Sequence, residues 1–370
     1  MNDAVFPLRD PVGPATPGLG EHSKAQIAEF VAPFANDADA HGVRRSTIDQ
    51  LAGAGLLGTP MATSENRELI ELIAGSDAST WFCWVQHFTP LRTLENAARE
   101  GERAGELFTR TLPKMRTGEM LAAVAFAHVR RPGPANPTAT RVDGGWRLDG
   151  SLDWVTSWDI ADVVMVMARG IGGNEGSLVC AFLPAGRSLS RTAGVVAGER
   201  LSLLAMGGTH TRPVMLDAAF IADEQIAAVL DRDVWLAQDA ITAADANPAV
   251  FGVTRGAIAE LDLLAEQRSD PSMAELVDAM VDECRSMRAR VYAGVDDRGA
   301  SVDRRLALRA ECLDMSIRAA NAVVVARAGA AMRTGHSAER RLRESAFLQV
   351  QAQTAASRRS SLALLTARSG

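Results

Sequence analysis

The stretch GGWRLDGSLDWVTSWDIADVVMVMARG, from Gly144 to Gly170, holds two strand patterns that meet at a pair of tryptophans. Between Trp146 and Trp154 apolar and polar side chains alternate, which is typical of a strand with one buried face. The alternation stops at Val155-Thr156-Ser157-Trp158, and the next strand, Val163 to Ala168, is apolar on both faces. Two indoles flanking two hydroxyls could form the wall and the hydrogen-bonding groups of a ligand site, or a buried corner that merely fills space.

The bulk composition is that of a globular protein. The chain has 370 residues, 47% of them hydrophobic and 23% charged, which is enough for two or three domains. The net charge of -6 argues against nucleic acid as a partner. No stretch approaches ~18 uninterrupted apolar residues and the N-terminus lacks a signal-peptide pattern, so we expect no membrane partner.

The four cysteines lie far apart, without CxxC spacing or a nearby histidine pair, at Cys83, Cys180, Cys284 and Cys312. This spacing predicts neither a disulfide framework nor a metal site. We expect reduced core thiols in a cytoplasmic protein.

The chain divides into three regions by the period of its apolar residues. Helical patterns over 1–117 give way to strand patterns over 118–230, and helical patterns return over 231–370. Tight turns at Asp143-Gly144-Gly145 and Gly170–Gly176 predict two hairpins. Strands are expected at 121–127, 138–142, 146–154, 163–168, 178–183 and 214–221.

Several helices have recognisable boundaries in the sequence. Ser46 is expected to cap a short helix, and Ala78 to Ala98 reads as one helix that is apolar nearly all round. Near the C-terminus, Gly335 breaks the chain before a last helix expected over about Ala338 to Ala367. Apolar residues along Ala319–Met332 and Leu342–Leu365 exceed the needs of one bundle, which predicts a homodimer or homotetramer.

This domain order and three motifs resemble the acyl-CoA dehydrogenase superfamily of flavoenzymes. The motifs are GWRLDG and WVTS within Gly145–Ser157, MGGT and the following strand within Met206–Ile221, and AERRLRE at Ala338–Glu344. The resemblance implies a mainly α fold with a central β domain. It would comprise an N-terminal α-helical domain, a middle antiparallel β-barrel domain and a C-terminal four-helix bundle.

The resemblance also implies a flavin cofactor, FAD or FMN, and places its contacts. In the family, the corner matching Trp154, Thr156 and Ser157 lies against the flavin ring. The strand Val124–His128 would lie beneath the ring, so Phe126 and His128 join the expected cofactor-binding residues. Phe126 and Trp154 would form the apolar wall, and the hydroxyls of Thr156 and Ser157 would donate hydrogen bonds.

The sequence departs from the family at the catalytic base. The family's glutamate falls at or next to Ala352, within Leu348–Thr354, where the chain has no carboxylate. An alternative position falls near Ala246–Phe251, where only Asp245 is close. Removing the α-proton of an acyl thioester requires a positioned base, so ordinary acyl-CoA desaturation is not expected.

Three other family motifs are also altered. The strand followed by T-E-P-x-x-G-S-D has become Ala125–Gly133, which keeps only the strand and a Pro-Gly. The glycine motif G-G-x-G-Y has become Ala328–Met332, and the motif that holds the adenine half is not recognisable near Cys284–Tyr292.

Three functions remain open on these residues. The first is a flavin-dependent oxidoreductase acting on an acyl thioester or another small organic substrate. The second is a monooxygenase supplied with reduced flavin by a separate reductase, for which His87 is the candidate catalytic residue because related hydroxylases can carry a histidine there. The third is a cofactor-free, non-catalytic subunit of a hetero-oligomer.

Two further histidines and three arginines are expected to have structural roles. His210 lies in an expected loop, and His336 is expected to cap or flank the last helix. Arg340, Arg341 and Arg343 resemble a phosphate-binding patch, but ion pairs at a subunit contact are the favoured interpretation.

Overall fold

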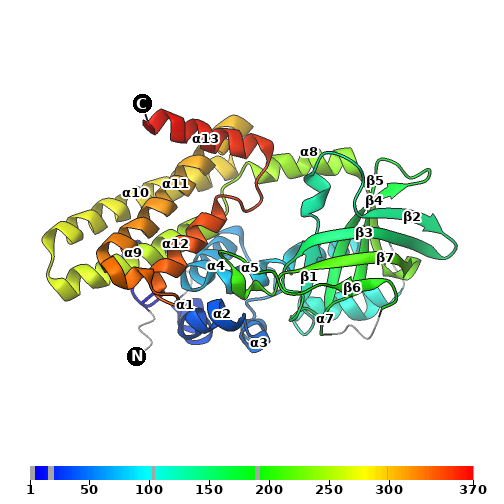
Figure 1. Ribbon diagram of the computed structural model, residues 1–370, viewed down its shortest axis with the longest axis horizontal. Coiled ribbons are helices and arrows are strands. Elements are labelled where there is room, and N and C mark those ends of the chain that lie inside the picture. The colour runs from blue at the N-terminus through cyan, green and yellow to red at the C-terminus, as the bar shows by residue number, and fades with distance from the viewer. Residues whose placement is uncertain (1–4, 16–20, 102–104, 188–191, 298, 370) are drawn as a thin grey trace.

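The computed structural model describes residues 5–15, 21–101, 105–187, 192–297 and 299–369. The molecule is elongated, with a helical bundle at one end, a β-sheet at the other and N-terminal helices between and below them (Figure 1). This arrangement matches the mainly α fold with a central β domain that the sequence predicts.

The N-terminal region is helical, as expected, but its boundaries differ at two places. The helix expected over Ala78–Ala98 is two helices, because α5 ends at Val85 and α6 begins at Phe88. Ser46 does not cap its helix, since α3 begins at Arg45 and the capping position makes no side-chain hydrogen bond. The helices are α1 (Glu21–Phe30), α2 (Ala35–His41), α3 (Arg45–Gly53), α4 (Thr63–Ser76), α5 (Ala78–Val85), α6 (Phe88–Arg99) and α7 (Leu112–Arg116).

Eight strands form one sheet in the hydrogen-bonded order β6-β7-β3-β2-β4-β5-β8, with β1 pairing β4 off this path. The path ends at β6 and β8, so among the described residues the sheet is open rather than a closed barrel. The strands are β1 (Ala122–Ala125), β2 (Thr138–Val142), β3 (Gly145–Val155), β4 (Val163–Ile171), β5 (Ser177–Pro184), β6 (Val195–Ala197), β7 (Arg212–Ala222) and β8 (Ile226–Asp231).

The expectation of a purely antiparallel sheet is wrong. β4 pairs in parallel with β1, where Ala122 lies opposite Val163, and with β2, where Thr138 lies opposite Arg169. The other pairs are antiparallel, including both predicted hairpins, β2–β3 and β4–β5. The sheet is therefore mixed, because β1 and β2 share one edge of β4 while β5 occupies the other.

The place of β4 explains why it is apolar on both faces. Val164, Val166 and Ala168 belong to one hydrophobic cluster, within the sheet. Met165 and Met167 belong to a second cluster, which the sheet shares with α6 and α7. Successive side chains of a strand point to opposite faces, so both faces of β4 are buried in hydrophobic cores.

The C-terminal region is a bundle in which α9, α10 and α11 pack together, with α12 against α11. The last helix expected over Ala338–Ala367 is two helices, separated by residues 349–354. Ala352 has a φ of 50° in this break, a left-handed conformation that does not continue a right-handed helix. The helices are α8 (Arg232–Ala243), α9 (Ala249–Arg268), α10 (Pro271–Asp296), α11 (Val302–Arg327), α12 (Ser337–Leu348) and α13 (Ala355–Ser369).

Candidate functional site

A cavity of about 370 Å³ lies where the bundle, α4, α6 and the turn after β1 come together. Its walls combine segments that are far apart in the chain, including the turn after β1, the end of α8 and the break between α12 and α13. The lining residues are Arg67, Thr89, Arg130, Asp239, Thr242, Ala243, Asp245, Ala246, Asn247, Pro248, Tyr292, Val295, Arg309, Gln351 and Ala352. We refer to it as the junction cavity.

Both positions that the sequence identifies for a catalytic base lie on the junction cavity. Ala352 and Gln351 line it from the break between α12 and α13, and Asp245 lines it from the segment between α8 and α9. Asp245 is held by Arg305, whose Nε lies 2.5 Å from Oδ1 and whose Nη2 lies 2.5 Å from Oδ2. Both oxygens of the carboxylate are therefore engaged with one guanidinium group.

Three arginines line the cavity, and sequence reasoning assigned a role to none of them. Arg130 forms two hydrogen bonds of 2.7 Å to Asp239, and Arg67 forms two of 2.9 and 2.6 Å to Asp296. Arg309 instead donates to backbone carbonyls, to Ala243 at 2.5 Å and to Gln351 at 2.6 Å. Burial holds the pKa of Arg309 below its ordinary value, as the desolvation of a cation should.

Tyr292 connects the cavity to a buried network of charges. Its hydroxyl donates to Glu71 at 2.6 Å, and burial and the negative charge of Glu71 raise the pKa of Tyr292 well above its ordinary value. The other oxygen of Glu71 accepts from Arg255 at 2.7 Å and from Arg288 at 2.9 Å. The phenol is therefore protonated, and it donates its proton in the hydrogen bond to Glu71.

The corner at the end of β3 does not line the junction cavity itself and is connected to it through the turn after β1. Arg130 lines the cavity, while the next residue, Arg131, pairs with Asp153 on β3. Trp154 follows Asp153 and keeps 50% of its surface exposed. The exposed indole is thus the part of the corner that is available to a ligand.

The hydroxyl of Thr156 belongs to a chain of three threonines. Thr209 Oγ1 donates to the carbonyl of Met206 at 2.7 Å, so it must accept from Thr211 at 2.8 Å. Thr211 in turn accepts from Thr156 at 3.2 Å. Each hydroxyl has one proton, and Thr156 donates its proton to Thr211. Thr156 can therefore act toward a ligand only as a hydrogen-bond acceptor.

Ser157 is fully buried and joins the sheet to the N-terminal helices. Its amide donates to the carbonyl of Thr209 at 2.9 Å, and its hydroxyl donates to the carbonyl of Cys83 at 3.4 Å. Its φ of 66° is in the left-handed region, where the chain turns away from β3.

Phe126 and His128 lie in the turn that follows β1. Phe126 is partly buried and contacts Trp235 edge-on, with ring centroids 5.9 Å apart. The Arg130 guanidinium lies 5.1 Å from the centroid of the same Phe126 ring. His128 donates from Nε2 to the carbonyl of Met167 at 2.6 Å, and burial lowers the pKa of its imidazole.

His87 lies between α5 and α6, with no exposed surface. Its Nε2 donates to the carbonyl of Met115 at 3.0 Å, and its Nδ1 accepts from the amide of Ala122 at 3.2 Å. Burial lowers the pKa of His87 to about 4. Both ring nitrogens form hydrogen bonds with the backbone. In this geometry the neutral imidazole has a structural role, which is to hold the start of β1 in position.

The remaining basic residues form contacts within the chain. His210 Nε2 donates to the carbonyl of Val43 at 2.8 Å, and His336 caps α12 by accepting from Ala338 at 3.1 Å. The three arginines of α12 form ion pairs, Arg340 with Glu344, Arg341 with Glu260, and Arg343 with Asp39 and Glu339. These arginines thus form ion pairs, as favoured, but with partners within the chain, and their place at a subunit contact stays a prediction.

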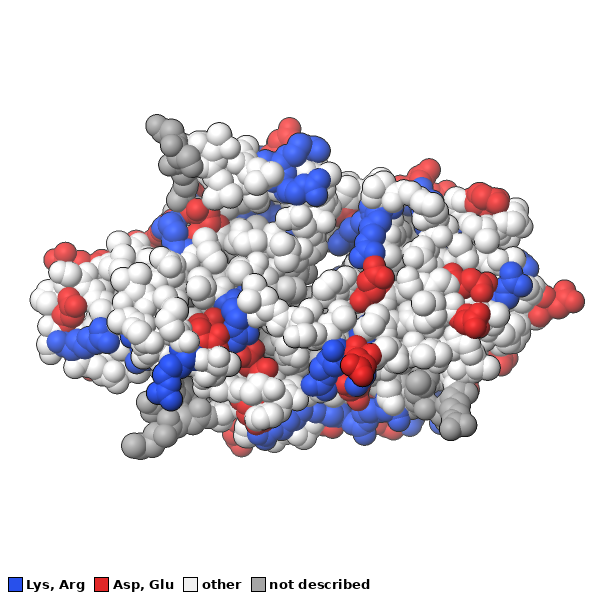
Figure 2. Space-filling view, in the orientation of Figure 1, with Lys and Arg blue, Asp and Glu red and all other residues white. Residues whose placement is uncertain are grey.

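The described residues offer neither a metal site nor a membrane-spanning helix. They contain no cluster of three or more His, Cys, Asp or Glu side chains that could hold a metal ion. Within the same part of the chain, none of the helices has both the length and the apolar character to cross a bilayer. Figure 2 shows basic and acidic side chains interspersed on one face, without a broad area of either sign.

A flavin fits the corner at the end of β3 in part. The half-exposed Trp154 provides the flat apolar surface that a flavin ring needs. Thr156 retains accepting lone pairs, whereas the hydroxyl of Ser157 is turned into the protein. The residues present therefore suit a flavin that stacks on Trp154 and donates to Thr156, with fewer hydrogen-bonding contacts than the sequence predicts.

Comparisons with known proteins support the fold. No family model matches the chain. One curated protein, benzylmalonyl-CoA dehydrogenase from Aromatoleum aromaticum, is 31% identical over 86 residues. That match covers 23% of this chain and 21% of the relative, so it spans about a fifth of the relative's length.

Solved structures match over nearly the whole chain. Butyryl-CoA dehydrogenase from Megasphaera elsdenii has a TM-score of 0.73 at 16% identity, covering 94% of this chain and 99% of that one. KijD3, solved with FMN and a dTDP-linked amino sugar, has a TM-score of 0.73 at 18% identity, covering 100% and 96%. Dibenzothiophene monooxygenase from Paenibacillus sp. A11-2 has a TM-score of 0.67 at 17% identity, covering 91% and 94%. The chain therefore has the acyl-CoA dehydrogenase-like fold.

Proposed function

We propose that this protein is a flavin-dependent oxidoreductase that acts on an acyl thioester or another small organic substrate in the junction cavity. The observation that carries the proposal is the placement of Trp154. This indole is half-exposed, and it stands in the sequence motif that resembles the family's flavin-contacting corner. The shared fold with a protein solved with FMN is consistent with the proposal.

The residues around the corner would each make a different contact with the cofactor, FAD or FMN, or support one that does. Trp154 and Phe126 would provide aromatic surface, and Thr156 would accept a hydrogen bond. His128 and Ser157, whose polar groups bond the backbone, would position this surface. A flavin supplies two-electron oxidation of the substrate or, when reduced, activation of oxygen.

Flavin titration of a double variant tests this proposal. Wild-type protein should quench FAD or FMN fluorescence saturably, whereas Trp154→Ala with Thr156→Ala should weaken binding by about tenfold or more, because stacking and a hydrogen bond are both lost. Phe220→Ala is the matched control, since Phe220 is an aromatic on the same sheet with 52% exposure. Unchanged affinity in the double variant would remove the assignment of this corner. Absence of binding in the wild type would favour a cofactor-free subunit.

A second candidate, a monooxygenase that receives reduced flavin from a separate reductase, is favoured by the state of Asp245. Desaturation of a thioester needs a base, and the cavity's carboxylate at this position is paired through both oxygens with Arg305. Oxygen activation on reduced flavin does not require that base. Oxygen uptake on addition of chemically reduced FMN, accelerated by the protein, would support this candidate. Uptake at the protein-free rate would count against it.

The bundle supports a proposal about assembly. Val325 is 71% exposed, Met332 is 69% exposed and Leu276 is 41% exposed. Leu276 and Val325 line one apolar hollow between α10 and α11. Exposed apolar surface of this kind favours a homodimer or homotetramer formed through the bundle.

A further inference from the structure

We propose that Arg309 binds an oxyanion of the substrate, a carboxylate or a phosphate ester, in the junction cavity. The inference rests on the proposed function insofar as it concerns the substrate of that site. The inference adds the chemical class of the substrate to the proposed function, because neither the fold nor the proposed oxidation requires a negatively charged group near the reacting atoms.

Arg309 is a buried cation whose strong hydrogen bonds go only to neutral groups. It lies on α11 and is 5% exposed, yet it lines the junction cavity. Its two terminal nitrogens donate to the carbonyls of Ala243 and Gln351. These two bonds fix the guanidinium between the end of α8 and the break after α12, where it remains beside the cavity.

The other cations of the cavity are neutralised, and Arg309 is not. Arg130 is paired with Asp239, and Arg67 with Asp296. Among the described residues, no carboxylate forms a salt bridge with Arg309. Asp245 lies near enough to favour the charge of Arg309, but both of its oxygens bond Arg305, and Arg130 opposes that charge.

A desolvated cation without a counterion is unfavourable in a protein interior. A substrate oxyanion that pairs with it recovers part of that cost, so charge selectivity is expected. Neutral donors on the same walls, the hydroxyl of Thr89 and the amide of Asn247, could bind the remaining oxygens. The cavity volume of about 370 Å³ suits a small molecule rather than a polymer.

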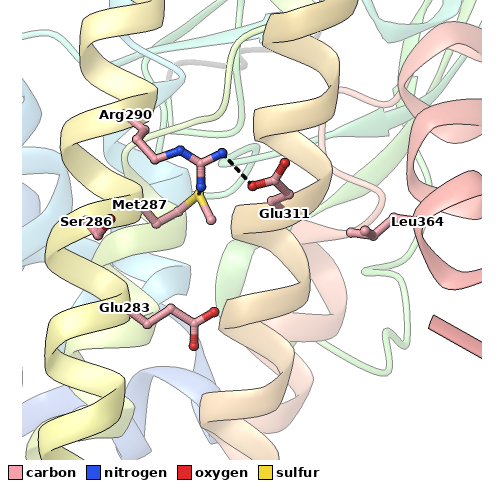
Figure 3. Close-up of a pocket in the computed structure, with 6 residues that line it drawn as sticks. All are labelled: Glu283, Ser286, Met287, Arg290, Glu311 and Leu364. Carbon is pink, nitrogen blue, oxygen red and sulfur yellow. Dashed lines mark hydrogen bonds and ion pairs between the residues drawn. The ribbon is translucent and has the colours of Figure 1, made fainter. Parts of the chain in front are cut away.

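The pocket between α10, α11 and α13 shows the contrasting arrangement (Figure 3). Arg290 lies in that pocket and donates to Glu311 at 2.9 Å, and Glu283 lies on the same wall. An arginine with its own carboxylate has little tendency to bind a further anion. Arg290 therefore provides a matched control for Arg309.

The test compares butyrate with butyramide, which have the same shape but differ in charge. Ligand-observed NMR titration of the unmodified protein should give an affinity for butyrate at least about tenfold higher, since hydrogen bonds to charged groups are worth about 1.5–3 kcal/mol. Equal affinities for butyrate and butyramide, together with no binding of inorganic phosphate, would overturn the proposal. Inorganic phosphate is the second arm. Tighter binding of phosphate than butyrate assigns the site to phosphate esters, and the reverse order assigns it to carboxylates.

Variants of the two arginines show which of them binds the anion. Arg309→Gln should lose the charge selectivity, Arg309→Lys should keep much of it, and Arg290→Gln should leave it unchanged. Retained selectivity in a folded Arg309→Gln protein would contradict the assignment. If Arg309→Gln fails to fold, the titrations of the unmodified protein with butyrate, butyramide and inorganic phosphate still decide whether it holds an oxyanion site, and Arg309→Lys tests the residue.

The outcome is separable from that of the proposed function, because the titrations need no flavin. A protein that binds flavin but shows no charge selectivity would refute only the anion site. A protein that binds butyrate selectively but no flavin would refute only the proposed oxidoreductase.

Discussion

The carboxylate of Asp245 accepts from the Arg305 guanidinium through both oxygens, at 2.5 Å each, on the wall that also includes Ala352. An ion pair with this two-point geometry occupies a lone pair on each oxygen of the carboxylate. The junction cavity thus contains a carboxylate at the alternative base position but holds it in a form poorly suited to accept a proton from a substrate.

We therefore predict that flavin-loaded protein does not desaturate simple acyl-CoA esters at an appreciable rate. General-base catalysis contributes about 10²–10⁴-fold, so at most a trace rate should remain without it. The measurement is anaerobic mixing with butyryl-CoA and longer esters while flavin absorbance is followed. Dithionite serves as the control that the bound flavin can be reduced, and prompt bleaching by any ester would mean that another group supplies the base.

Stability should depend on pH through His87. Its pKa of about 4 in the folded protein is below the value near 6.5 of an exposed imidazole. The unfolded chain therefore gains the proton first as pH falls, and stability present above pH ~6.5 is lost as pH falls toward about 4. The expected loss is about 3 kcal/mol, measured by urea unfolding at a series of pH values.

The variant His87→Gln isolates this effect. Glutamine can donate to Met115 and accept from Ala122, but it does not titrate. Asp77 acts in the opposite sense, since burial raises its pKa to about 6 and its contribution is lost as pH rises. The prediction therefore concerns the difference between wild type and variant, and parallel pH profiles for the two proteins would contradict it.

The cysteines should be unreactive in the native protein. All four are free thiols buried in the cores, and burial raises the pKa of each to about 12. A thiol reacts as the thiolate and only when it is accessible, so Ellman's reagent should detect almost no thiol before unfolding. In denaturant it should detect all four, and a prompt reaction of the native protein would show that one of the cores opens.

The protein should associate through the bundle. Light scattering at micromolar concentration is expected to give a dimer or tetramer, and Val325→Asp should shift the distribution toward monomer because a charge would be buried at the contact. Val196→Asp is the control, since Val196 is 62% exposed on the sheet. A monomeric wild type would refute this prediction.

The general fold could be predicted from the sequence because the period of apolar residues changes sharply between regions. Strand β4 was recognisable by its apolar residues alone, and its two hydrophobic cores explain that pattern. Its parallel pairing with β1 was not, because apolar periodicity does not state the direction of a neighbouring strand. The breaks at His87 and at residues 349–354 were also missed, since neither contains a proline or glycine.

The candidate site was predictable only in part. The motif at Trp154–Ser157 drew attention to the corner, but the backbone contacts of Ser157 depend on α5, which is distant in sequence. Arg309 had no recognisable signal, since one arginine among many in a helix looks like a surface residue. Its lack of a counterion follows from three-dimensional packing alone.

The most direct test of the account is the absorption spectrum of the purified protein after incubation with FAD or FMN and removal of unbound flavin. We predict a retained flavin spectrum whose intensity rises in proportion to protein and falls in the variant with Trp154→Ala and Thr156→Ala. Protein that stays colourless with both flavins, while remaining folded, would contradict the proposal that this fold serves flavin chemistry here.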